Sequence, residues 1–564
     1  MNLNIKITWP AGLWINSTSD IISNTFAYLW YNILTDIEYE SRIKGWVNYF
    51  DIFVSDENVY LTKYVDIIVA FNLESLQKNI FSLRKNWVIF CNEKLKDKFD
   101  DKTKEIISIN QLKIISLDIS DKYENTYLLW LFAKYFDIEA NVIYHSLKEV
   151  FGKKWDSVLN ANINIFNNVI SQISLEKWKL DIKKIWSEKE ISYGNKIIAY
   201  WAIDAKLEYY SAYPMTPAST ILTEIISSKK VTYLQAEDEI AVINSAIWAS
   251  YTWSRSMVWT SWWGFALMTE ALSFAIEAEF PITVVLSQRA WPSTWTPTYH
   301  ETWDINFALN PTFWDFEHIV LTPSSLEEAY FFAWLSLNLA DKYQTIVILL
   351  IDKQLSELSW TFENLEKVIV DRWIILDNPP DDYKRYEFNE TWVSPRVVVW
   401  TKNGDFISSS YEHDEYGATS EDSENKKLMT EKRWKKLENF FKKEGISGFE
   451  NFYADDVKNG LKPFPTRLII TFSATSYTAK EFVDKNSEYG LVIIKFLKPL
   501  DERLLDILKD KEEIIFVENN YSGQLENYIS GHFWLRYINW LKISHLRKYD
   551  LFPFYIEDFN ELKN

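Results

Sequence analysis

The stretch Ser256-Met257-Val258-Trp259-Thr260-Ser261-Trp262-Trp263-Gly264 decides how this chain folds. Residues 256–259 form a short apolar strand, and residues 260–264 have the chemistry of a loop everywhere except at the two indoles. A tight turn between a strand and a helix favours residues without a Cβ atom. Tryptophan therefore stands where glycine is expected, and this affects how every other motif is interpreted.

The composition shows the same exchange along the whole chain. The 564 residues include 27 Trp and only 13 Gly, and together these make up about 7% of the chain, the usual share of glycine alone. The turns at 9–14 and 288–295 also carry indoles at glycine-like positions. We hypothesise that the gene reads the UGA codon as glycine and that UGA is translated here as tryptophan. A genuine Trp-rich surface that stacks on sugars or partners is the alternative, but it does not explain the missing glycine.

The chain is long enough for about three domains. An alternation of short apolar strands with helical segments predicts a parallel α/β domain at residues 194–370. The strands of this domain are expected at 231–234, 256–259, 281–286, 318–321 and 345–350. A similar alternation predicts a parallel α/β layer at 1–175, with strands at 3–8, 66–71, 87–90 and 113–117 and a helix at 18–31. Strands at 468–472, 490–495 and 513–517 predict a third domain at 465–564. We expect a charged linker helix at 176–193, and a connecting segment at 371–464 with a helix near 425–443.

Bulk properties exclude several classes of function. The net charge of −19 disfavours nucleic acid as a partner. No apolar run reaches the roughly 18 residues that a membrane span needs, and residues 1–6 lack a signal-peptide pattern. Cys91 is the only cysteine, which fits the cytoplasm and is too few for an iron–sulfur cluster, since a cluster takes about four thiolates.

Several motifs resemble one family in the same order along the chain. They are Tyr213–Thr220, Gln235–Ala241, Thr260–Met268, Gln288–Thr298 and Asn338–Thr345. With Trp read as glycine, the third becomes TSGGGFALM and the fourth QRAGPSTGTPT. This region resembles the α subunit of 2-oxoacid:ferredoxin oxidoreductases, which use thiamine diphosphate. Residues 412–417 and 517–525 resemble that subunit's final domain, and residues 9–14 and 41–46 resemble the γ domain that is often fused ahead of it.

The resemblance implies a multi-domain α/β fold. It consists of a γ-type domain, a doubly wound domain that binds the thiamine pyrimidine, and a C-terminal domain like that of transketolase. The implied reaction converts a 2-oxoacid, CoA and oxidised ferredoxin into acyl-CoA, CO₂ and reduced ferredoxin. We expect a hetero-oligomer, because the Mg²⁺ and the [4Fe-4S] cluster must come from a separate β subunit that shares the thiamine diphosphate. The sequence favours 2-oxoglutarate by resemblance alone and does not separate it from pyruvate or branched-chain oxoacids.

Glu239 is the catalytic candidate that the resemblance supplies. The aminopyrimidine of thiamine diphosphate needs a carboxyl group against N1′ to favour its imino tautomer. A glutamate with this role should be desolvated and hold its proton more tightly than usual. The alternative is that residues 237–239 are first-turn acids favoured by the helix dipole.

Arg289 is the candidate for the substrate carboxylate, because a guanidinium binds a carboxylate through two hydrogen bonds. A surface ion pair is the alternative. By resemblance, Thr216, Thr294 and Thr298 line the same pocket, although turn hydroxyls are nearly as common. Cofactor-binding candidates are Tyr213, Pro214 and Gly264, where Gly264 permits close approach or simply packs against a helix.

Other features of the sequence give weaker functional signals. No metal constellation is visible, and we expect His413 to be structural. The GxxGxG-like turn at 9–14 is a weak nucleotide signal, and Arg42 and Asn48 have no assigned role. Lys206 and Leu551 fall where small residues are expected. Two other functions stay open: a non-oxidative thiamine-dependent 2-oxoacid decarboxylase subunit, and a Trp-rich binding module without catalysis.

Overall fold

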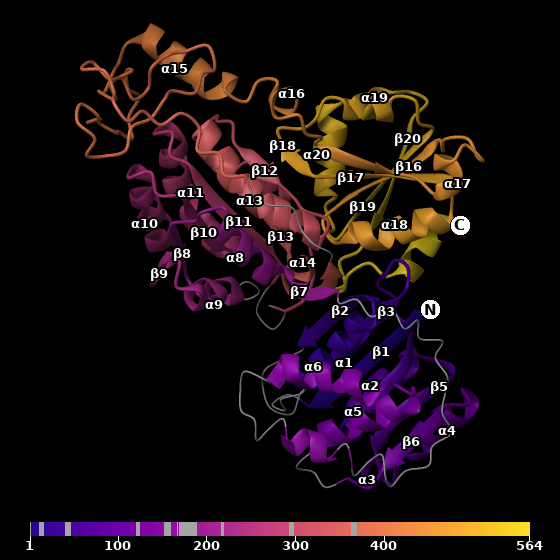
Figure 1. Ribbon diagram of the computed structural model, residues 1–564. Coiled ribbons are helices and arrows are strands. Elements are labelled where there is room, and N and C mark those ends of the chain that lie inside the picture. The colour runs from indigo at the N-terminus through magenta and orange to yellow at the C-terminus, as the bar shows by residue number, and fades with distance from the viewer. Residues whose placement is uncertain are drawn as a thin grey trace. The chain divides into compact units, whose positions relative to one another are not determined.

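The computed structural model describes residues 2–10, 16–39, 47–119, 124–151, 160–165, 167, 189–215, 219–292, 298–362 and 369–563 (Figure 1). Two units emerge from the contacts within the chain. Unit 1 comprises Met1–Tyr193, Glu357–Asn364 and Tyr555–Asn560, and unit 2 comprises Gly194–Ser356, Leu365–Phe554 and Glu561–Asn564. Most of the predicted linker helix at 176–193 lies outside the described residues.

Unit 1 is built on an eight-stranded mixed sheet in the order β6-β5-β4-β1-β3-β2-β14-β7. The strands are β1 (Asn2–Pro10), β2 (Asn32–Tyr39), β3 (Val47–Ser55), β4 (Val65–Ala70), β5 (Leu83–Asn92), β6 (Lys113–Leu117), β7 (Glu190–Tyr193) and β14 (Ser359–Phe362). The four predicted strands correspond to β1, β4, β5 and β6 and are parallel as expected, but the sheet also contains antiparallel strands that were not predicted. Strand β3 pairs antiparallel with β1 and β2. Only seven residues separate β2 from β3, too few for a parallel crossover.

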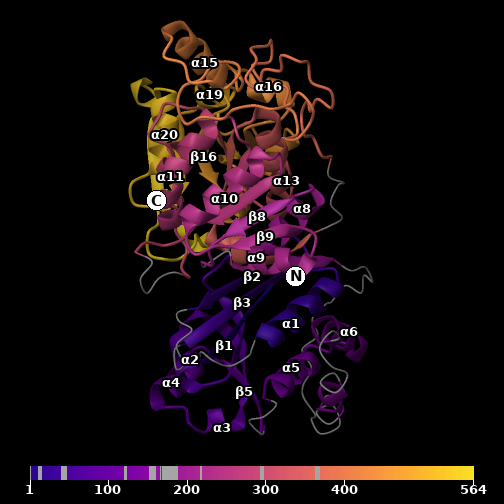
Figure 2. The same ribbon diagram turned by 90° about the vertical axis from the view of Figure 1, so that its left-hand side faces the viewer.

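Helices cover both faces of this sheet (Figure 2). Alternate residues of β4 and β5 enter two separate cores, one against α1, α5 and α6 and the other against α2 and α3. The helices are α1 (Asn16–Tyr28), α2 (Leu73–Asn79), η1 (Ile80–Ser82), α3 (Glu93–Lys96), α4 (Asp101–Ile109), α5 (Glu124–Tyr135) and α6 (Ala140–Phe151).

Unit 2 contains the predicted doubly wound sheet, in the order β18-β12-β13-β11-β10-β8-β9, parallel except for β18. Its strands are β8 (Tyr209–Ala212), β9 (Thr232–Gln235), β10 (Ser256–Thr260), β11 (Ile282–Gln288), β12 (Ile319–Leu321), β13 (Ile346–Asp352) and β18 (Phe496–Lys498). The five predicted strands are confirmed, and β8 was missed. Every residue of β10, β11 and β13 is buried, as expected for a parallel sheet covered on both faces.

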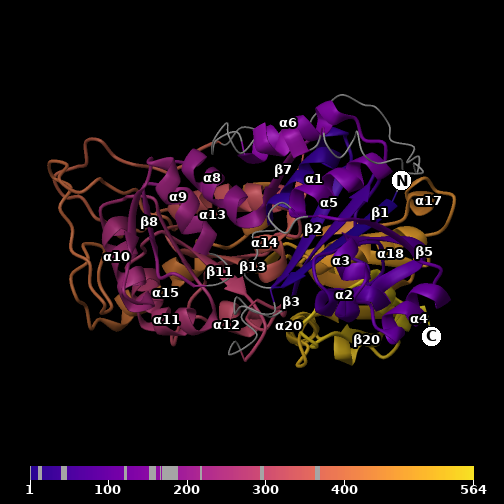
Figure 3. The ribbon, with the colours of Figure 1, turned by 90° about the horizontal axis from the view of Figure 1, so that it is seen from below.

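The covering helices pack in pairs. Helix α10 packs against α11, and α8 packs against α13, with the strands between the two pairs (Figure 3). The helices of this region are α8 (Gly194–Asp204), α9 (Ser219–Ser228), α10 (Glu239–Tyr251), α11 (Trp262–Glu277), α12 (Ile305–Leu309), α13 (Leu326–Tyr343) and α14 (Lys353–Glu357). No helix in the described ranges combines the length and apolar character that a membrane crossing needs.

The C-terminal part of unit 2 has its own sheet, in the order β15-β17-β16-β19-β20. Its strands are β15 (Phe449–Phe452), β16 (Arg467–Phe472), β17 (Tyr489–Ile494), β19 (Glu513–Glu518) and β20 (Lys542–Arg547). The predicted strands at 468–472, 490–495 and 513–517 correspond to β16, β17 and β19, which are parallel to one another. The helices are α17 (Asp455–Lys458), α18 (Thr475–Lys485), α19 (Leu504–Leu508), α20 (Gln524–His532) and η3 (Leu535–Tyr537). The last helix, η4 (Ile556–Lys563), begins in the residues that belong to unit 1 and ends in those of unit 2.

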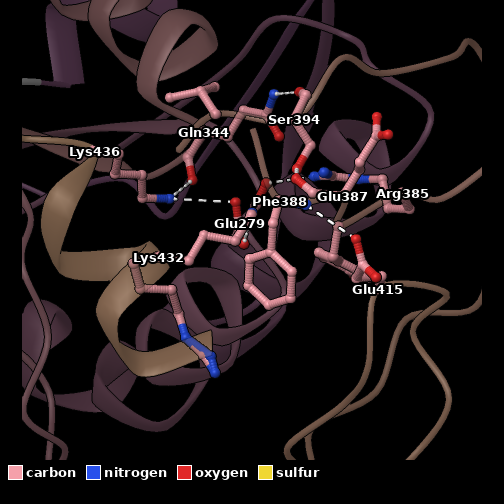
Figure 4. Close-up of polar contacts among 12 residues, drawn as sticks. Glu279, Gln344, Arg385, Glu387, Phe388, Ser394, Glu415, Lys432 and Lys436 are labelled. Atoms are coloured by element: carbon pink, nitrogen blue, oxygen red, sulfur yellow. Dashed lines mark hydrogen bonds and ion pairs between the residues drawn. The ribbon is translucent and has the colours of Figure 1, made fainter. Parts of the chain in front are cut away.

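A buried ionic network attaches the connecting segment to the parallel domain. Helices α15 (Ser423–Lys435) and α16 (Phe440–Glu444) occupy the place of the predicted helix near 425–443. Glu279 lies 2.5 Å from Lys432 and 3.5 Å from Lys436, and all three side chains are buried. Lys436 also donates to the Gln344 carbonyl oxygen (Figure 4). Because breaking a buried ion pair leaves an uncompensated charge, this network fixes the segment firmly.

Tryptophan is over-represented in the left-handed backbone region. Among the described residues, 17 non-glycine residues have positive φ, and six of them are tryptophan: Trp30, Trp253, Trp373, Trp392, Trp400 and Trp534. After α10, Ser254 N–H donates to the Ala249 carbonyl and Trp253 N–H donates to that of Ser250. This is the Schellman pattern, whose left-handed position is usually glycine. Lys206 and Leu551, expected to be small residues, also have positive φ.

Candidate active site

The site is centred on the turn that follows β10. The strand ends at Thr260, and Ser261 precedes α11 with an extended backbone. Gly264 lies in the first turn of α11, where a Cβ atom would fall 2.2 Å from Thr260 Oγ1 and 2.4 Å from Glu239 Oε1. Contacts this short do not occur in folded proteins, so only glycine leaves room for the Glu239 carboxyl group.

Glu239 is the first residue of α10. Its neighbour Asp238 supplies the N-cap, because its carboxylate accepts a hydrogen bond of 2.7 Å from Ala241 N–H. Glu239 is free of that role and is only 5% exposed. Burial raises the pKa of the Glu239 carboxyl group above its usual range, and nearby Asp238 acts in the same direction. The cap and the buried carboxyl group are therefore separate residues.

The turn also carries buried polar atoms without a hydrogen-bond partner. Ser261 Oγ and Trp262 Nε1 are both in this state. The Trp262 and Trp263 rings lie 4.5 Å apart between centroids, and Trp263 is largely exposed. Tyr213 is also exposed, at the end of the neighbouring strand β8. Similar unpartnered atoms occur elsewhere among the described residues, so these two describe the turn without by themselves defining a binding place.

Arg289 follows β11 directly and is 9% exposed. Its guanidinium lies 5.9 Å from the centroid of the Trp262 ring, and Nε has no hydrogen-bond partner. Burial lowers the pKa of Arg289, and the charge of Asp304 opposes this change. Burial raises the pKa of Asp304 to about 7, although the positive charge of Arg289 counteracts it. A guanidinium in this setting can bind an incoming carboxylate.

The segment of residues 298–304 is hydrogen-bonded to the end of β11 and to the residue after Arg289. Ala290 N–H donates to the Tyr299 carbonyl, and Asp304 N–H donates to Gln288 Oε1 at 3.1 Å. Thr298 lies at the start of this segment and is partly buried. Thr216 and Thr294, the other predicted pocket hydroxyls, lie outside the described residues.

Sequence reasoning assigned no role to two residues beside Arg289. Asp304 is a buried acid whose negative charge raises the pKa of Arg289. The side chain of Gln288 accepts a hydrogen bond from the backbone N–H of Asp304. An acid 15 positions after an arginine gives no local signal. Pro214 and Tyr213 are both exposed. Their contact with the cofactor stays a prediction.

His413 belongs to a cluster of buried and partly buried charged residues. In the described part of the chain, one group could offer three metal-ligand atoms within 4.8 Å, namely Glu277, Glu412 and His413. Arg433, however, lies 2.9 Å from Glu277 and 2.6 Å from Glu412. Its guanidinium therefore pairs with both carboxylates of this group.

Comparison with known families agrees with this geometry. Residues 5–172 match the family described as pyruvate ferredoxin/flavodoxin oxidoreductase. Residues 200–432 match the family described as pyruvate flavodoxin/ferredoxin oxidoreductase, thiamine diP-bdg. The second match covers Glu239, Gly264 and Arg289, and defines a thiamine diphosphate-binding domain.

Curated relatives match over most of their length. The 2-oxoacid:ferredoxin oxidoreductase subunit alpha of Sulfolobus sp is 28% identical, covering 93% of this chain and 91% of the relative. The 2-oxoglutarate synthase subunit KorA of Methanocaldococcus jannaschii is 30% identical, covering 58% of this chain and 87% of the relative. A solved structure, the 2-oxoglutarate:ferredoxin oxidoreductase of Magnetococcus marinus, has a TM-score of 0.86 and 26% identity, covering 100% of this chain and 99% of that chain.

The fold, the buried glutamate and these matches define a subunit of a thiamine-dependent oxidoreductase. The chain belongs to the 2-oxoacid:ferredoxin oxidoreductase family, as an alpha subunit. The expected multi-domain α/β fold and the family are thereby confirmed.

Proposed function

We propose that this subunit, together with a β subunit, oxidatively decarboxylates 2-oxoglutarate in the presence of CoA and ferredoxin. The observation that carries the proposal is the buried Glu239 carboxyl group, for which Gly264 leaves space. The choice of 2-oxoglutarate is supported by the KorA relatives and by the Magnetococcus enzyme, which is described with 2-oxoglutarate, coenzyme A and succinyl-CoA bound.

The residues present fit thiamine diphosphate. When bound, this cofactor supplies a nucleophilic carbon that attacks the keto group of a 2-oxoacid. Glu239 would hold a proton at the aminopyrimidine N1′, and the upward direction of its pKa shift suits a carboxyl group that gives and takes a proton. Gly264 allows the ring to approach, and Arg289 would bind the carboxylate of the 2-oxoacid.

The other half of the site must come from a partner. Cys91 is the only cysteine of the chain, it is buried, and burial raises its thiol pKa to about 12, so it is a poor cluster ligand. The sequence also has no GDG-type motif for a diphosphate and Mg²⁺. We propose that a β subunit provides the Mg²⁺ site and the [4Fe-4S] cluster, and that the complex works in the cytoplasm.

A substrate panel tests the function. The subunit is co-purified with its β subunit from the native host, and reduction of ferredoxin is followed with 2-oxoglutarate, pyruvate and a branched-chain 2-oxoacid. We expect CoA-dependent turnover with the highest kcat/KM for 2-oxoglutarate. A higher value for pyruvate would refute the substrate, and decarboxylation without CoA or an electron acceptor would favour a non-oxidative decarboxylase.

We also propose that many tryptophans of this sequence are glycine in the native protein. A bulky residue in the left-handed region costs about 1–2 kcal/mol, and Trp30 and Trp253 both occupy the Schellman position where glycine costs nothing. Glycine at 262 and 263 would in addition open the approach to Gly264. A genuine Trp-rich binding surface explains neither observation.

The masses of two tryptic peptides from native-host protein test this recoding. Peptide 231–255 contains Trp248 and Trp253, and peptide 256–289 contains Trp259, Trp262 and Trp263. We expect each peptide to be lighter by the corresponding number of Trp-to-Gly differences. Masses that match tryptophan at all five positions would refute the recoding and favour the Trp-rich binding module.

A further inference from the structure

The segment of residues 299–306, which comes after Arg289 in the chain, contacts two parts of unit 2. On one side it holds the end of β11, through the hydrogen bonds from Ala290 N–H to Tyr299 O and from Asp304 N–H to Gln288 Oε1. The residues on either side of Arg289 are therefore tied to residues 299–304. These bonds flank Arg289 on both sides.

On its other side the segment is held by the turn after β19. Thr302 N–H donates to the Asn519 carbonyl oxygen at 2.9 Å. The carbonyl oxygen of Thr302 accepts from Asn520 Nδ2 at 3.1 Å. Both backbone groups of Thr302 are thus bound by consecutive residues of the C-terminal domain.

Gln524, the first residue of α20, holds the next part of the segment. Its Oε1 accepts from Asn306 N–H at 3.0 Å, and its Nε2 donates to the Trp303 carbonyl at 2.8 Å. Helix α12, which begins at Ile305, accordingly packs beside α20 (Figure 3). Gln524 is almost fully buried. Its two hydrogen bonds bracket the backbone of Asp304, the residue whose charge acts on Arg289.

The turn itself is rigid. Asn520 is fully buried, and its Oδ1 accepts from Gly523 N–H at 2.8 Å while its Nδ2 also donates to Glu518 at 2.7 Å. The Glu518 carboxylate in turn accepts from Leu525 N–H at the start of α20. The Asn520 amide donates and accepts at this place, whereas an aspartate would have no donor and would face the Glu518 carboxylate.

We propose that Asn520 and Gln524 are positioning residues for the 2-oxoacid carboxylate site. They fix the backbone of residues 302–306, and this segment fixes both Asp304 and the end of β11 that carries Arg289. The C-terminal domain thus sets substrate affinity without contacting the substrate. This inference rests on the proposed role of Arg289 in binding the substrate carboxylate.

Steady-state kinetics of Gln524→Ala in the complex with the β subunit test the proposal. We expect the KM for the 2-oxoacid to rise about tenfold, while kcat and the KM for CoA change less than twofold, because only substrate binding is weakened. Gln524→Glu keeps the acceptor for Asn306 N–H but loses the donor to Trp303 O, so an intermediate KM is expected. Ser522→Ala, in the exposed part of the same turn, is the matched control and should leave all constants unchanged.

Hydrogen exchange gives a readout that does not depend on turnover. We expect the amides of residues 302–306 to exchange at least tenfold faster in Gln524→Ala than in the wild type and in Ser522→Ala. Wild-type exchange rates in Gln524→Ala, or a 2-oxoacid KM within twofold of the wild type, would overturn the positioning role. A wild-type complex that turns over no 2-oxoacid would instead refute the proposed function, whatever the exchange result.

Discussion

Replacing Gly264 with alanine puts a methyl group where the Glu239 carboxyl group lies. The new Cβ would fall 2.4 Å from Glu239 Oε1 and 2.2 Å from Thr260 Oγ1, so the glutamate must move. Overpacking of this kind costs about 1–3 kcal/mol of stability. Loss of a positioned proton-transfer group lowers rates about 10²–10⁴-fold. We therefore expect Gly264→Ala to lower kcat at least about 100-fold in the complex with the β subunit, with a modest fall in thermal midpoint.

Gly531→Ala is the matched control for this substitution. Gly531 lies within α20, and a Cβ atom there would meet nothing within 4 Å. We expect this variant to keep full activity and to gain about 0.5–1 kcal/mol of stability. The assay is CoA- and 2-oxoacid-dependent reduction of ferredoxin, with thermal unfolding measured on the same preparations. A Gly264→Ala enzyme with more than half of the wild-type kcat would show that Glu239 does not depend on this space.

Three further predictions concern charge and backbone. Arg289→Ala should raise the KM for the 2-oxoacid at least about 30-fold, because one partner of a charge-assisted pair is lost, and an unchanged KM would exclude the carboxylate role. Burial raises the pKa of Asp304 to about 7, so the folded state holds this proton more tightly than the unfolded state, and stability should fall as pH rises from about 4 to 7 by up to about 4 kcal/mol. Thermal midpoints at pH 5 and 8 should therefore differ less in Asp304→Asn than in the wild type, and an equal difference would contradict this. Trp400→Gly, at an exposed position with φ of 78°, should stabilise the Trp-containing protein by about 1 kcal/mol, whereas Trp248→Gly inside α10 should destabilise it similarly, as measured by chemical unfolding.

Apolar patterning predicted most of the parallel core of unit 2. Strands β10, β11 and β13 are buried along their whole length, so their apolar runs are continuous and bounded by turns. Strand β8 was missed because Tyr209–Ala212 is short and polar in part, and its pairing with β10 decides its conformation. In unit 1, the antiparallel hairpin of β2 and β3 was missed because their tyrosines, aspartates and asparagines hide the alternation.

The site was only partly readable from sequence. Glu239 and Arg289 stand within motifs that resemble a family, but the space for the Glu239 carboxyl group depends on Gly264 across two helices, which no local pattern shows. Asp304 acts on Arg289 from 15 positions away, and Asn520 and Gln524 reach residues more than 200 positions earlier in the chain. The composition, by contrast, shows the glycine deficit directly. The tryptophans with positive φ are a second observation behind the proposal that some of them are glycine in the native protein.

The kcat of Glu239→Gln in the complex with its β subunit is the most direct test of the site. Glutamine keeps the shape of the side chain but cannot hold an exchangeable carboxyl proton, so we predict a fall of at least about 100-fold in kcat with little change in the 2-oxoacid KM. Glu237→Gln, an exposed acid two positions earlier, should behave like the wild type. Full activity of Glu239→Gln would contradict the assignment of this residue as the activating carboxyl group.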